Sequence, residues 1–399
     1  METKVFTDNF ADAAEIIKAG GLVAVPTETV YGLAGNGLDA EAVEKIYEVK
    51  GRPAVKPLAL MVPDESAMEL YCEDVPEQAK FLAEKFWPGP LSIVLKSKEL
   101  VPEIVRAGGS TVALRCPDHA MTLGLLKAAN LPFAAPSANP SGEPSPKNAE
   151  TVKAYFDGKI QGIIDGGDCG IGTESTIIDM SGAPYRILRK AALSEEKIRE
   201  ALAESLRVIG ITGGTGCGKT TALLELEKRG ALIIDCDSVY HEMLESSEEM
   251  LSDIKNAFPT AFDNGKFDRK KLGGIVFGDD EKLMRLNEIT HRHIIKEVER
   301  RLEDWAMQGG KLAAIDAIAL IESGIAKRCD CVVGVVADKE KRIRRIMARD
   351  NISREYAESR VDAQKNEAFY LENCDFVARN NGTEQEFINE LENIFGEVL

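Results

Sequence analysis

The segment Gly213-Gly214-Thr215-Gly216-Cys217-Gly218-Lys219-Thr220 indicates the fold of the second half of the chain, because it matches the pattern GxxxxGK[ST]. In this pattern the glycines let consecutive backbone N–H groups turn towards a phosphate, the lysine reaches the terminal phosphates, and the last hydroxyl can bind Mg²⁺. We expect Lys219 to act in catalysis and Thr220 to hold the metal ion. The residues expected to bind ATP are Gly213, Gly214, Gly216, Cys217, Gly218, Lys219, Thr220 and Thr221.

The residues on either side of this stretch favour a phosphate-binding loop. Residues 208–212 read as a buried strand, and residues 221–227 read as a helix whose N-terminus faces the anion. A glycine-rich turn with a chance lysine is the alternative, and it explains neither flank. A phosphate-binding loop usually follows the first strand of its domain, so the preceding half of the chain needs a fold of its own.

The length of the chain, 399 residues, exceeds what one hydrophobic core usually supports, and two domains are expected. Residues 191–205 read as a short amphipathic helix with Ser194 as its N-cap. Since the strand before the phosphate-binding loop follows at once, we place the domains at residues 1–205 and 206–399. No linker rich in glycine, serine or proline separates them.

Composition excludes several classes of protein. The net charge of −17 argues against extended nucleic-acid binding. The chain has eight cysteines without a C-x-x-C pair and four histidines, which disfavours a zinc site or a disulfide framework. The first residues lack a signal sequence, and no apolar run approaches a membrane span. We therefore expect a cytoplasmic protein that does not contact membranes.

Hydrophobic patterning predicts an α/β protein. In the first half, strands are expected at 21–25, 91–95 and 111–114, with helices near 9–19, 39–50, 76–86 and 119–129. In the second half, strands at 207–212, 231–235, 311–316 and 331–337 alternate with helices. Regular alternation predicts a parallel sheet that is covered on both faces.

Polar clusters follow predicted strands in the first half, at 26–33, 50–57 and 135–145, with smaller ones at 115–117 and 174–176. Hydroxyls and cations at strand ends suit a nucleotide phosphate and a small amino acid. Simple turn formation by proline, glycine, serine and asparagine explains such clusters equally well from spacing alone.

Several segments of the first half occur in the order of one known family. They are PTETVYGL at 26–33, KGRP at 50–53, WPGPLS at 87–92, APSANPSG at 135–142, GTESTIID at 172–179 and ILR at 187–189. Together they resemble the YrdC family of threonylcarbamoyl-AMP synthases over nearly all of residues 5–200. The resemblance implies a twisted mixed sheet with helices. It also implies that L-threonine, bicarbonate and ATP are joined into threonylcarbamoyl-AMP and pyrophosphate, the first step of threonylcarbamoyladenosine formation in tRNA.

The resemblance also implies roles for single residues. Lys50 and Arg52 would be catalytic and, with Ser137 and Asn139, would form the polar tetrad of the family. Threonine would be held by Thr29, Arg115 and Ser175, and ATP by Lys56, Thr111, Ser137, Asn139, Ser145 and Arg189. No residue is an obvious general base, so we expect catalysis by positioning and charge stabilisation.

Carboxylates and arginines extend the pattern in the second half. Asp235 and Asp237 follow a predicted strand, where one could accept a proton from an acceptor hydroxyl and the other could bind Mg²⁺. An Asx turn capping the next helix is the alternative. Four arginines on predicted helices, Arg344, Arg345, Arg349 and Arg360, suit a lid over phosphate or, equally, a solvated helix face.

The second half also carries segments of a known family. They are GITGGTGCGKTT at 210–221, IDCDSVYHEML at 234–244, FDRKKLGGIVF at 267–277, LNEITHRHI at 286–294, RIMARD at 345–350, Arg360 with Gln364, and 380–382 near the adenine. They resemble dephospho-CoA kinase over residues 207–397. The resemblance implies a P-loop kinase with a parallel sheet, a lid and a helical acceptor-binding region, which phosphorylates the 3′-hydroxyl of dephospho-CoA.

In this resemblance Asp237 is the catalytic aspartate and Asp235 a second Mg²⁺ ligand. Further implied ligands are Arg345 and Arg349 for ATP, and His241, Arg269 and His291 for the acceptor. Two departures concern the acceptor region: residues 317–322 replace the usual Pro-Leu-Leu-Phe-Glu, and Arg292 replaces a proline.

We therefore expect a bifunctional enzyme that uses L-threonine, bicarbonate, ATP, dephospho-CoA and Mg²⁺. Its first product implies transient contact with a tRNA-modifying threonylcarbamoyltransferase. Alternatives remain for each half: an RNA-binding module for the first, a kinase for another small acceptor such as a nucleoside monophosphate for the second, or a degenerate regulatory domain for either.

Overall fold

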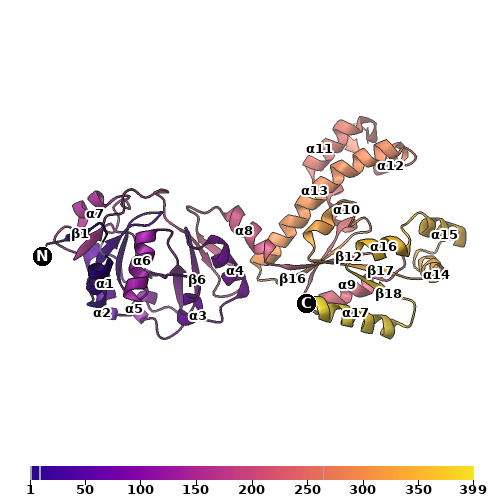
Figure 1. Ribbon diagram of the computed structural model, residues 1–399. Helices are drawn as coiled ribbons and strands as arrows, with labels where there is room; N and C mark the ends of the chain where they lie inside the picture. Colours follow the sequence, from indigo (N-terminus) through magenta and orange to yellow (C-terminus); the bar gives the residue numbers. More distant parts are fainter. Residues whose placement is uncertain (1, 9, 264) are drawn as a thin grey trace. The chain divides into compact units, whose positions relative to one another are not determined.

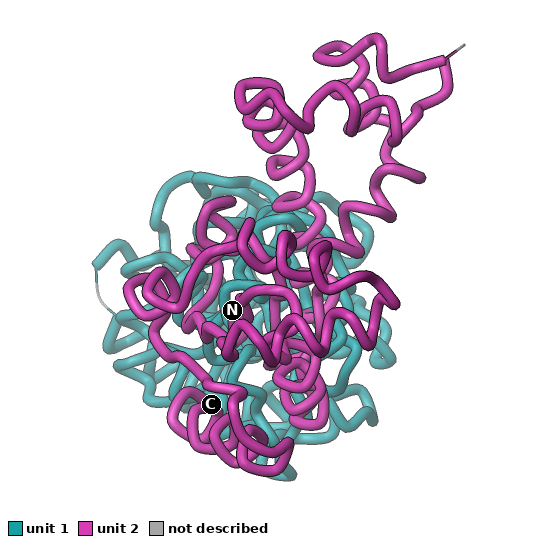
Figure 2. Tube along the Cα trace, turned by 90° about the vertical axis from the view of Figure 1, so that its right-hand side faces the viewer, with its two compact units in different colours: residues 1–205, 307–309 teal, residues 206–306, 310–399 magenta. Residues whose placement is uncertain are grey.

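The computed structural model describes residues 2–8, 10–263 and 265–399. The chain divides into two compact units, which Figure 2 shows in different colours. Unit 1 contains Met1–Ser205 and Met307–Gly309, and unit 2 contains Leu206–Ala306 and Gly310–Leu399.

Unit 1 is built on a mixed sheet in the order β1-β9-β2-β3-β8-β4-β7-β6-β10-β11, with β5 beside β6. Its strands are β1 (Lys4–Phe6), β2 (Val23–Val25), β3 (Gly32–Asn36), β4 (Ala59–Met61), β5 (Cys72–Glu73), β6 (Leu91–Ser97), β7 (Thr111–Arg115), β8 (Phe133–Ala134), β9 (Gly162–Ile164), β10 (Thr176–Asp179) and β11 (Arg186–Arg189). The sheet contains both parallel pairs, such as β4 with β7, and antiparallel pairs, such as β6 with β7. The expected mixed sheet is confirmed.

The helices of unit 1 are α1 (Phe10–Lys18), α2 (Ala40–Lys50), α3 (Ala67–Tyr71), α4 (Glu77–Phe86), α5 (Glu103–Arg106), α6 (Ala120–Ala129), α7 (Ala149–Phe156) and α8 (Glu195–Glu204). The predicted helices at 39–50, 76–86 and 119–129 are confirmed; of the one at 9–19, residue 9 lies outside the described residues. Asp39 caps α2, and Gly51 ends it in the left-handed region at φ 57°. Ser194 caps α8 as expected.

Helices α1 and α6 cover one part of the sheet in unit 1. Apolar side chains of both helices, including Ile17 and Leu125, pack on Val23, Val25 and Ile164 with almost no exposure to solvent. Burial of this apolar area is the main stabilising contribution. The sheet is therefore held rigidly while the loops at its strand ends remain available for a site.

Unit 2 contains a fully parallel sheet in the order β13-β16-β12-β17-β18. Its strands are β12 (Arg207–Thr212), β13 (Leu232–Asp235), β16 (Leu312–Asp316), β17 (Cys331–Val336) and β18 (Phe376–Arg379); β14 (Phe262–Asp263) and β15 (Lys266–Phe267) form a separate small pair. The predicted parallel sheet is confirmed. The P-loop strand β12 lies in the middle, between β16 and β17.

The helices of unit 2 are α9 (Lys219–Lys228), α10 (Cys236–Ser246), α11 (Glu248–Ala257), α12 (Arg269–Val276), α13 (Asp280–Met307), α14 (Lys339–Asp350), α15 (Arg354–Asp362), α16 (Glu367–Asn373) and α17 (Glu384–Val398), with 3₁₀ turns η1 (Pro259–Ala261) and η2 (Ile325–Arg328). Helices α9 and α17 pack together on the sheet through Leu226, Phe387 and Leu391. Helices α11 and α12 pack around the beginning of α13 and form the helical projection in Figure 1.

Candidate functional site

A cavity of about 300 Å³ opens in unit 1 among the ends of the central strands. Of the residues proposed from the sequence, its wall contains Arg52, Thr111, Arg115, Ser137, Ser175 and Arg189. The other proposed residues, Thr29, Lys50, Lys56, Asn139 and Ser145, are not on the wall. Segments from five parts of the sequence thus meet at one place, as a site would require.

Lys50 is buried behind the wall, where it anchors the loop that carries Ser137. Its Nζ donates hydrogen bonds to the backbone oxygens of Ser137 and Asn139. Burial and the nearby Arg52 lower the pKa of Lys50 to about 8, against an opposing effect of Glu174. Lys50 therefore holds this loop and does not line the cavity, and its catalytic role stays a prediction.

Three other proposed residues that are not on the wall, Asn139, Lys56 and Ser145, differ in their contacts and exposure. The Asn139 amide donates to the backbone oxygens of Pro140 and Glu143, at 3.0 and 2.7 Å. Its Oδ1 atom is buried without a hydrogen-bond partner among the described residues. Lys56 is exposed. Ser145 donates to Glu174 at 3.2 Å and so reaches the cavity wall indirectly.

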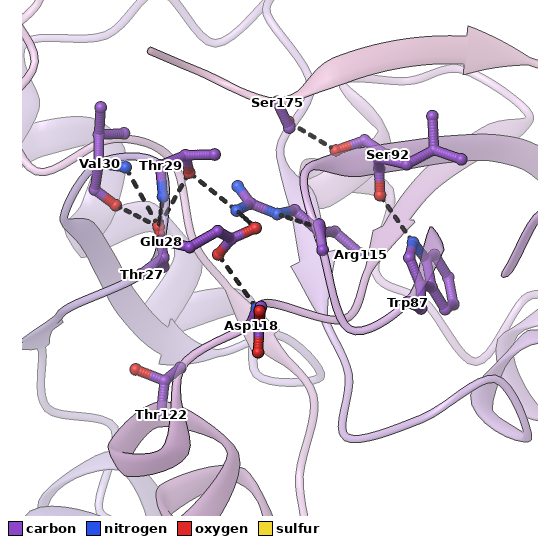
Figure 3. Close-up of polar contacts among 12 residues, drawn as sticks. Thr27, Glu28, Thr29, Val30, Trp87, Ser92, Arg115, Asp118, Thr122 and Ser175 are labelled. Carbon is purple, nitrogen blue, oxygen red and sulfur yellow. Dashed lines mark hydrogen bonds and ion pairs between the residues drawn. The ribbon is translucent and has the colours of Figure 1, made fainter. Parts of the chain in front are cut away.

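Arg115 forms a buried ion pair with Glu28 (Figure 3). Its Nη2 lies 2.8 Å from Glu28 Oε1 and 2.8 Å from Thr29 Oγ1. The other oxygen of Glu28 accepts the backbone N–H of Asp118 at 3.0 Å. The two side chains are only 8% and 13% exposed, so the pair depends on these hydrogen bonds. Glu28 was not among the residues proposed from the sequence, although it lies inside the segment 26–33.

A second polar group lies around Ser175. Its hydroxyl is 2.9 Å from that of Ser92 and accepts from Arg189 Nη2 at 3.1 Å. Arg189 also pairs with Glu174, which lines the cavity and was not among the proposed residues. The cavity therefore combines three guanidinium groups, two of them already paired with carboxylates, and several hydroxyls. This combination suits a ligand with both anionic and neutral polar groups.

Unit 2 has a cavity of about 380 Å³ at the carboxyl edge of its parallel sheet, where ligands bind in such folds. Its wall contains the proposed residues Gly214, Gly216, Gly218, Lys219, Thr220, Asp235, Asp237, Arg345, Arg349 and Arg360, together with Thr215, Asp316, Ile318 and Ile346. Gly213, Cys217 and Thr221 lie off the wall, as does Arg344, which is exposed.

The P-loop is held in shape by hydrogen bonds from two residues that lie much later in the sequence. Gln364 accepts the Thr215 N–H and donates to its hydroxyl, both at 2.9 Å. Arg342 donates to the backbone oxygen of Thr215 at 3.0 Å. A Cβ atom at Gly213, which has φ 145°, would lie 2.2 Å from the backbone oxygen of Val335. Only glycine allows this approach, and the loop leads into the N-terminus of α9, which favours an anion.

Asp316 was missed by the sequence analysis. It ends β16, and its Oδ1 lies 3.8 Å from Nζ of Lys219. This atom is buried and has no hydrogen-bond partner among the described residues. Burial raises the pKa of Asp316 to about 6, with Asp235 and Asp237 adding to the rise and Lys219 opposing it. Its place as the last residue of a buried strand beside the P-loop strand is the signal that could have identified it.

Asp235 has the capping role that we kept as an alternative. Its two oxygens accept from the backbone of Asp237 at 2.9 Å and from the Ser238 hydroxyl at 2.8 Å, at the start of α10. It still lines the cavity beside Asp237. The described residues contain no group of three or more His, Cys, Asp or Glu arranged to hold a metal ion.

A further cavity of about 290 Å³ in unit 2 shares the lining residues Asp237 and Ile318 with the P-loop cavity. Its wall is mainly apolar, with Asn287 and His291 among its polar members. Burial lowers the pKa of His291, which favours its neutral form. His241 and Arg269 are not on this wall; Arg269 lines a separate groove at α12.

The two departures from the kinase pattern lie in different places. Ala317, Ile318 and Ala319 line the apolar cavity, so the changed segment does shape it. Arg292 instead forms an ion pair with Asp253 of α11 at 2.5 Å and tightens the helical region.

Comparisons with known proteins give different relatives for the two halves. Residues 15–191 match the Sua5/YciO/YrdC family model, described as telomere recombination, and residues 207–386 match the CoaE model, described as dephospho-CoA kinase. A threonylcarbamoyl-AMP synthase of Pyrococcus abyssi is 48% identical over 192 residues, which are 48% of this chain and 56% of that protein. This chain thus spans little more than half the length of that relative.

Two other relatives are covered almost completely. A putative threonylcarbamoyl-AMP synthase of Mycobacterium tuberculosis is 37% identical over 191 residues, 48% of this chain and 87% of that protein. A dephospho-CoA kinase of Geobacter sulfurreducens is 37% identical over 192 residues, 48% of this chain and 98% of that protein. Among the described residues, no helix has the length and apolarity needed to cross a membrane.

Proposed function

Because the chain belongs to the Sua5/YciO/YrdC family through its first half and to the dephospho-CoA kinase family through its second, we propose that it is a bifunctional enzyme. Residues 1–205 form the domain that makes threonylcarbamoyl-AMP and pyrophosphate from L-threonine, bicarbonate and ATP. Residues 206–399 form the domain that transfers the γ-phosphate of ATP to the 3′-hydroxyl of dephospho-CoA. The two domains share ATP as a substrate and act in the cytoplasm.

The synthase proposal rests on the meeting of Arg52, Arg115, Arg189, Ser137 and Ser175 at one cavity. The threonine carboxylate binds at Arg115 and Ser175, and the triphosphate binds at Arg52 and Arg189. The threonine amine adds to bicarbonate and water leaves, which yields a carbamate. A carbamate oxygen then forms a bond to the α-phosphorus while the bond to the pyrophosphate oxygen breaks. Guanidinium groups held in place stabilise the charge that develops on the α-phosphate and on the leaving pyrophosphate.

Lys50 supports this reaction by anchoring Ser137 rather than by touching the substrate. The product is an activated adenylate, so an enzyme that transfers its carbamoyl group to tRNA must take it up. We propose that contact with such a transferase is transient.

The kinase proposal rests on Asp237, which lines both the P-loop cavity and the apolar cavity beside it. A hydroxyl bound in the apolar cavity then lies next to the γ-phosphate of ATP in the P-loop cavity. Asp237 accepts the proton of that hydroxyl as its oxygen attacks the γ-phosphorus, and ADP leaves on the opposite side. Lys219 and Arg349 stabilise the charge on the transferring group.

The residues around Lys219 fit a magnesium ion. Thr220, Asp235 and Asp316 offer hard oxygen ligands at one wall, and the buried Oδ1 of Asp316 lacks a hydrogen-bond partner among the described residues. Mg²⁺ is usually held by one or two carboxylates together with substrate phosphates, so a cage of three protein carboxylates is not required. When bound, the ion would neutralise charge on the phosphates.

Assays of the purified full chain test both activities. We expect pyrophosphate release that requires both threonine and bicarbonate, and ADP formation that requires dephospho-CoA and not nucleoside monophosphates. Lys219→Ala should abolish only the second activity and Arg52→Ala only the first. Turnover of a nucleoside monophosphate in preference to dephospho-CoA would overturn the acceptor assignment.

A further inference from the structure

Two arginines on the wall of the P-loop cavity form ion pairs with the same carboxylate. Arg349, near the end of α14, donates from Nε to Asp350 Oδ1 at 2.7 Å and from Nη2 to Oδ2 at 3.1 Å. Arg360, on α15, donates from Nη1 to the same Oδ2 at 2.6 Å. Both arginines line the cavity, whereas Asp350 does not. The carboxylate therefore joins the two guanidinium groups without itself lining the cavity.

This arrangement leaves donors for a ligand. Arg349 uses Nε and Nη2 in a bidentate contact that fixes the plane of its guanidinium group, and its Nη1 has no hydrogen-bond partner within the described part of the chain. Arg360 uses Nη1 for Asp350, and its Nε and Nη2 groups likewise bond to no described residue. A phosphate oxygen can thus bind both arginines without displacing Asp350.

A carboxylate between two arginines reduces the repulsion between their positive charges. The side chains of Arg349 and Arg360 are 60% and 36% exposed. Without a partner, two such long cations would repel each other and sample many rotamers. With Asp350 between them, the repulsion falls and one net positive charge remains. Hydrogen bonds from both arginines lower the pKa of Asp350 to about 2, so it stays ionised at neutral pH.

We propose that Asp350 is a positioning residue of the kinase site, which sets Arg349 and Arg360 so that both guanidinium groups meet the terminal phosphate of a nucleoside triphosphate. This inference rests on the proposed kinase function. A purely structural role, in which Asp350 only ties α14 to α15, is the competing explanation. The same helices also carry the ion pair of Glu340 with Arg354 at 2.6 Å, whose residues do not line the cavity.

The test compares Asp350→Asn with Glu340→Gln in the full chain. For each variant, the dissociation constants of ATP and ADP are measured by calorimetry without an acceptor. We expect the preference for ATP over ADP to fall about fivefold or more in Asp350→Asn, as loss of a charge-assisted contact implies, and to change less than twofold in Glu340→Gln. An unchanged preference in Asp350→Asn, or equal losses in both variants, would overturn the proposal. This measurement stands even if dephospho-CoA proves not to be the acceptor.

A second measurement asks whether Asp350 acts through the two arginines. The turnover number for CoA formation should fall about tenfold or more in Asp350→Asn. In an Arg349→Ala/Arg360→Ala background, the same change should cost less than twofold, because its partners are already gone. Asp350→Glu, which keeps the charge, should recover part of the turnover. Additive losses in the triple variant would show that Asp350 acts independently of the arginines and would refute the inference.

Discussion

Lys219 of the P-loop and Asp316 at the end of β16 face each other, with Nζ 3.8 Å from Oδ1. Both side chains are about six-sevenths buried, at 14% and 15% exposure. Strands β12 and β16 are direct neighbours, which brings the end of β16 beside the loop that follows β12. The lysine proposed to meet the transferring phosphate thus forms an ion pair within the protein, although the distance is too long for a hydrogen bond.

Asp316→Asn should change the pH dependence of stability. The folded pKa of Asp316 is raised to about 6, above the roughly 3.9 of an unfolded aspartate. Between these values the folded state binds more protons than the unfolded state, so wild-type stability falls as pH rises from about 4 to 6. The free energy of unfolding of Asp316→Asn should therefore rise by roughly 2 kcal/mol relative to that of the wild type over this pH interval. A constant difference between pH 4 and 7 would contradict the assignment.

Asp237→Asn should lower CoA formation by about a hundredfold or more, because a general base typically contributes roughly 10²–10⁴-fold. The affinity for ATP should stay within a few-fold of wild type, since the variant keeps the size of the side chain. Single-turnover phosphorylation and nucleotide binding on one preparation measure both effects. If Asp235→Asn is inactive and Asp237→Asn is not, the roles of the two aspartates are reversed.

Lys50→Met should reduce pyrophosphate release at the synthase site by about tenfold or more, because the loop that carries Ser137 loses its anchor. Lys45→Met is a matched control. Lys45 lies on the same helix and also donates to a backbone oxygen, that of Gly20 at 2.9 Å, but Gly20, unlike Ser137, does not line the cavity. Similar losses in both variants would mean that any anchoring lysine of α2 matters equally.

Glu28→Gln should destabilise unit 1 by about 3 kcal/mol, because it leaves the buried Arg115 with a neutral partner. The control is Glu69→Gln, which removes an exposed ion pair with Lys80 and should cost much less stability, because solvent screens such a pair. Chemical denaturation of both variants measures the difference. Threonine should also bind less tightly to Glu28→Gln, since Glu28 orients the guanidinium group proposed to hold it. Equal stability of the two variants would contradict this account of the pair.

The parallel sheet of unit 2 and the P-loop can be predicted from the amino-acid sequence, because both follow from local signals. Glycine spacing sets the loop, and apolar runs alternating with helical patterns set the strands and helices. Segments 26–33, 50–53 and 135–142 likewise pointed to a polar site in unit 1 before any contact was known. These patterns depend on neighbours in the chain, so a single sequence carries them.

The packing of distant segments determines which side chains within those segments line a cavity and which support it from behind. Lys50 reaches the 137–139 loop across more than eighty residues of sequence, and Glu28 meets Arg115 across a similar span. Asp316 looked like the last residue of an ordinary strand until β16 was placed beside β12. Burial, charge pairing and the shift of its pKa arise from contacts between distant segments. Such contacts depend on the packing of the sheet, which no local pattern in the chain encodes.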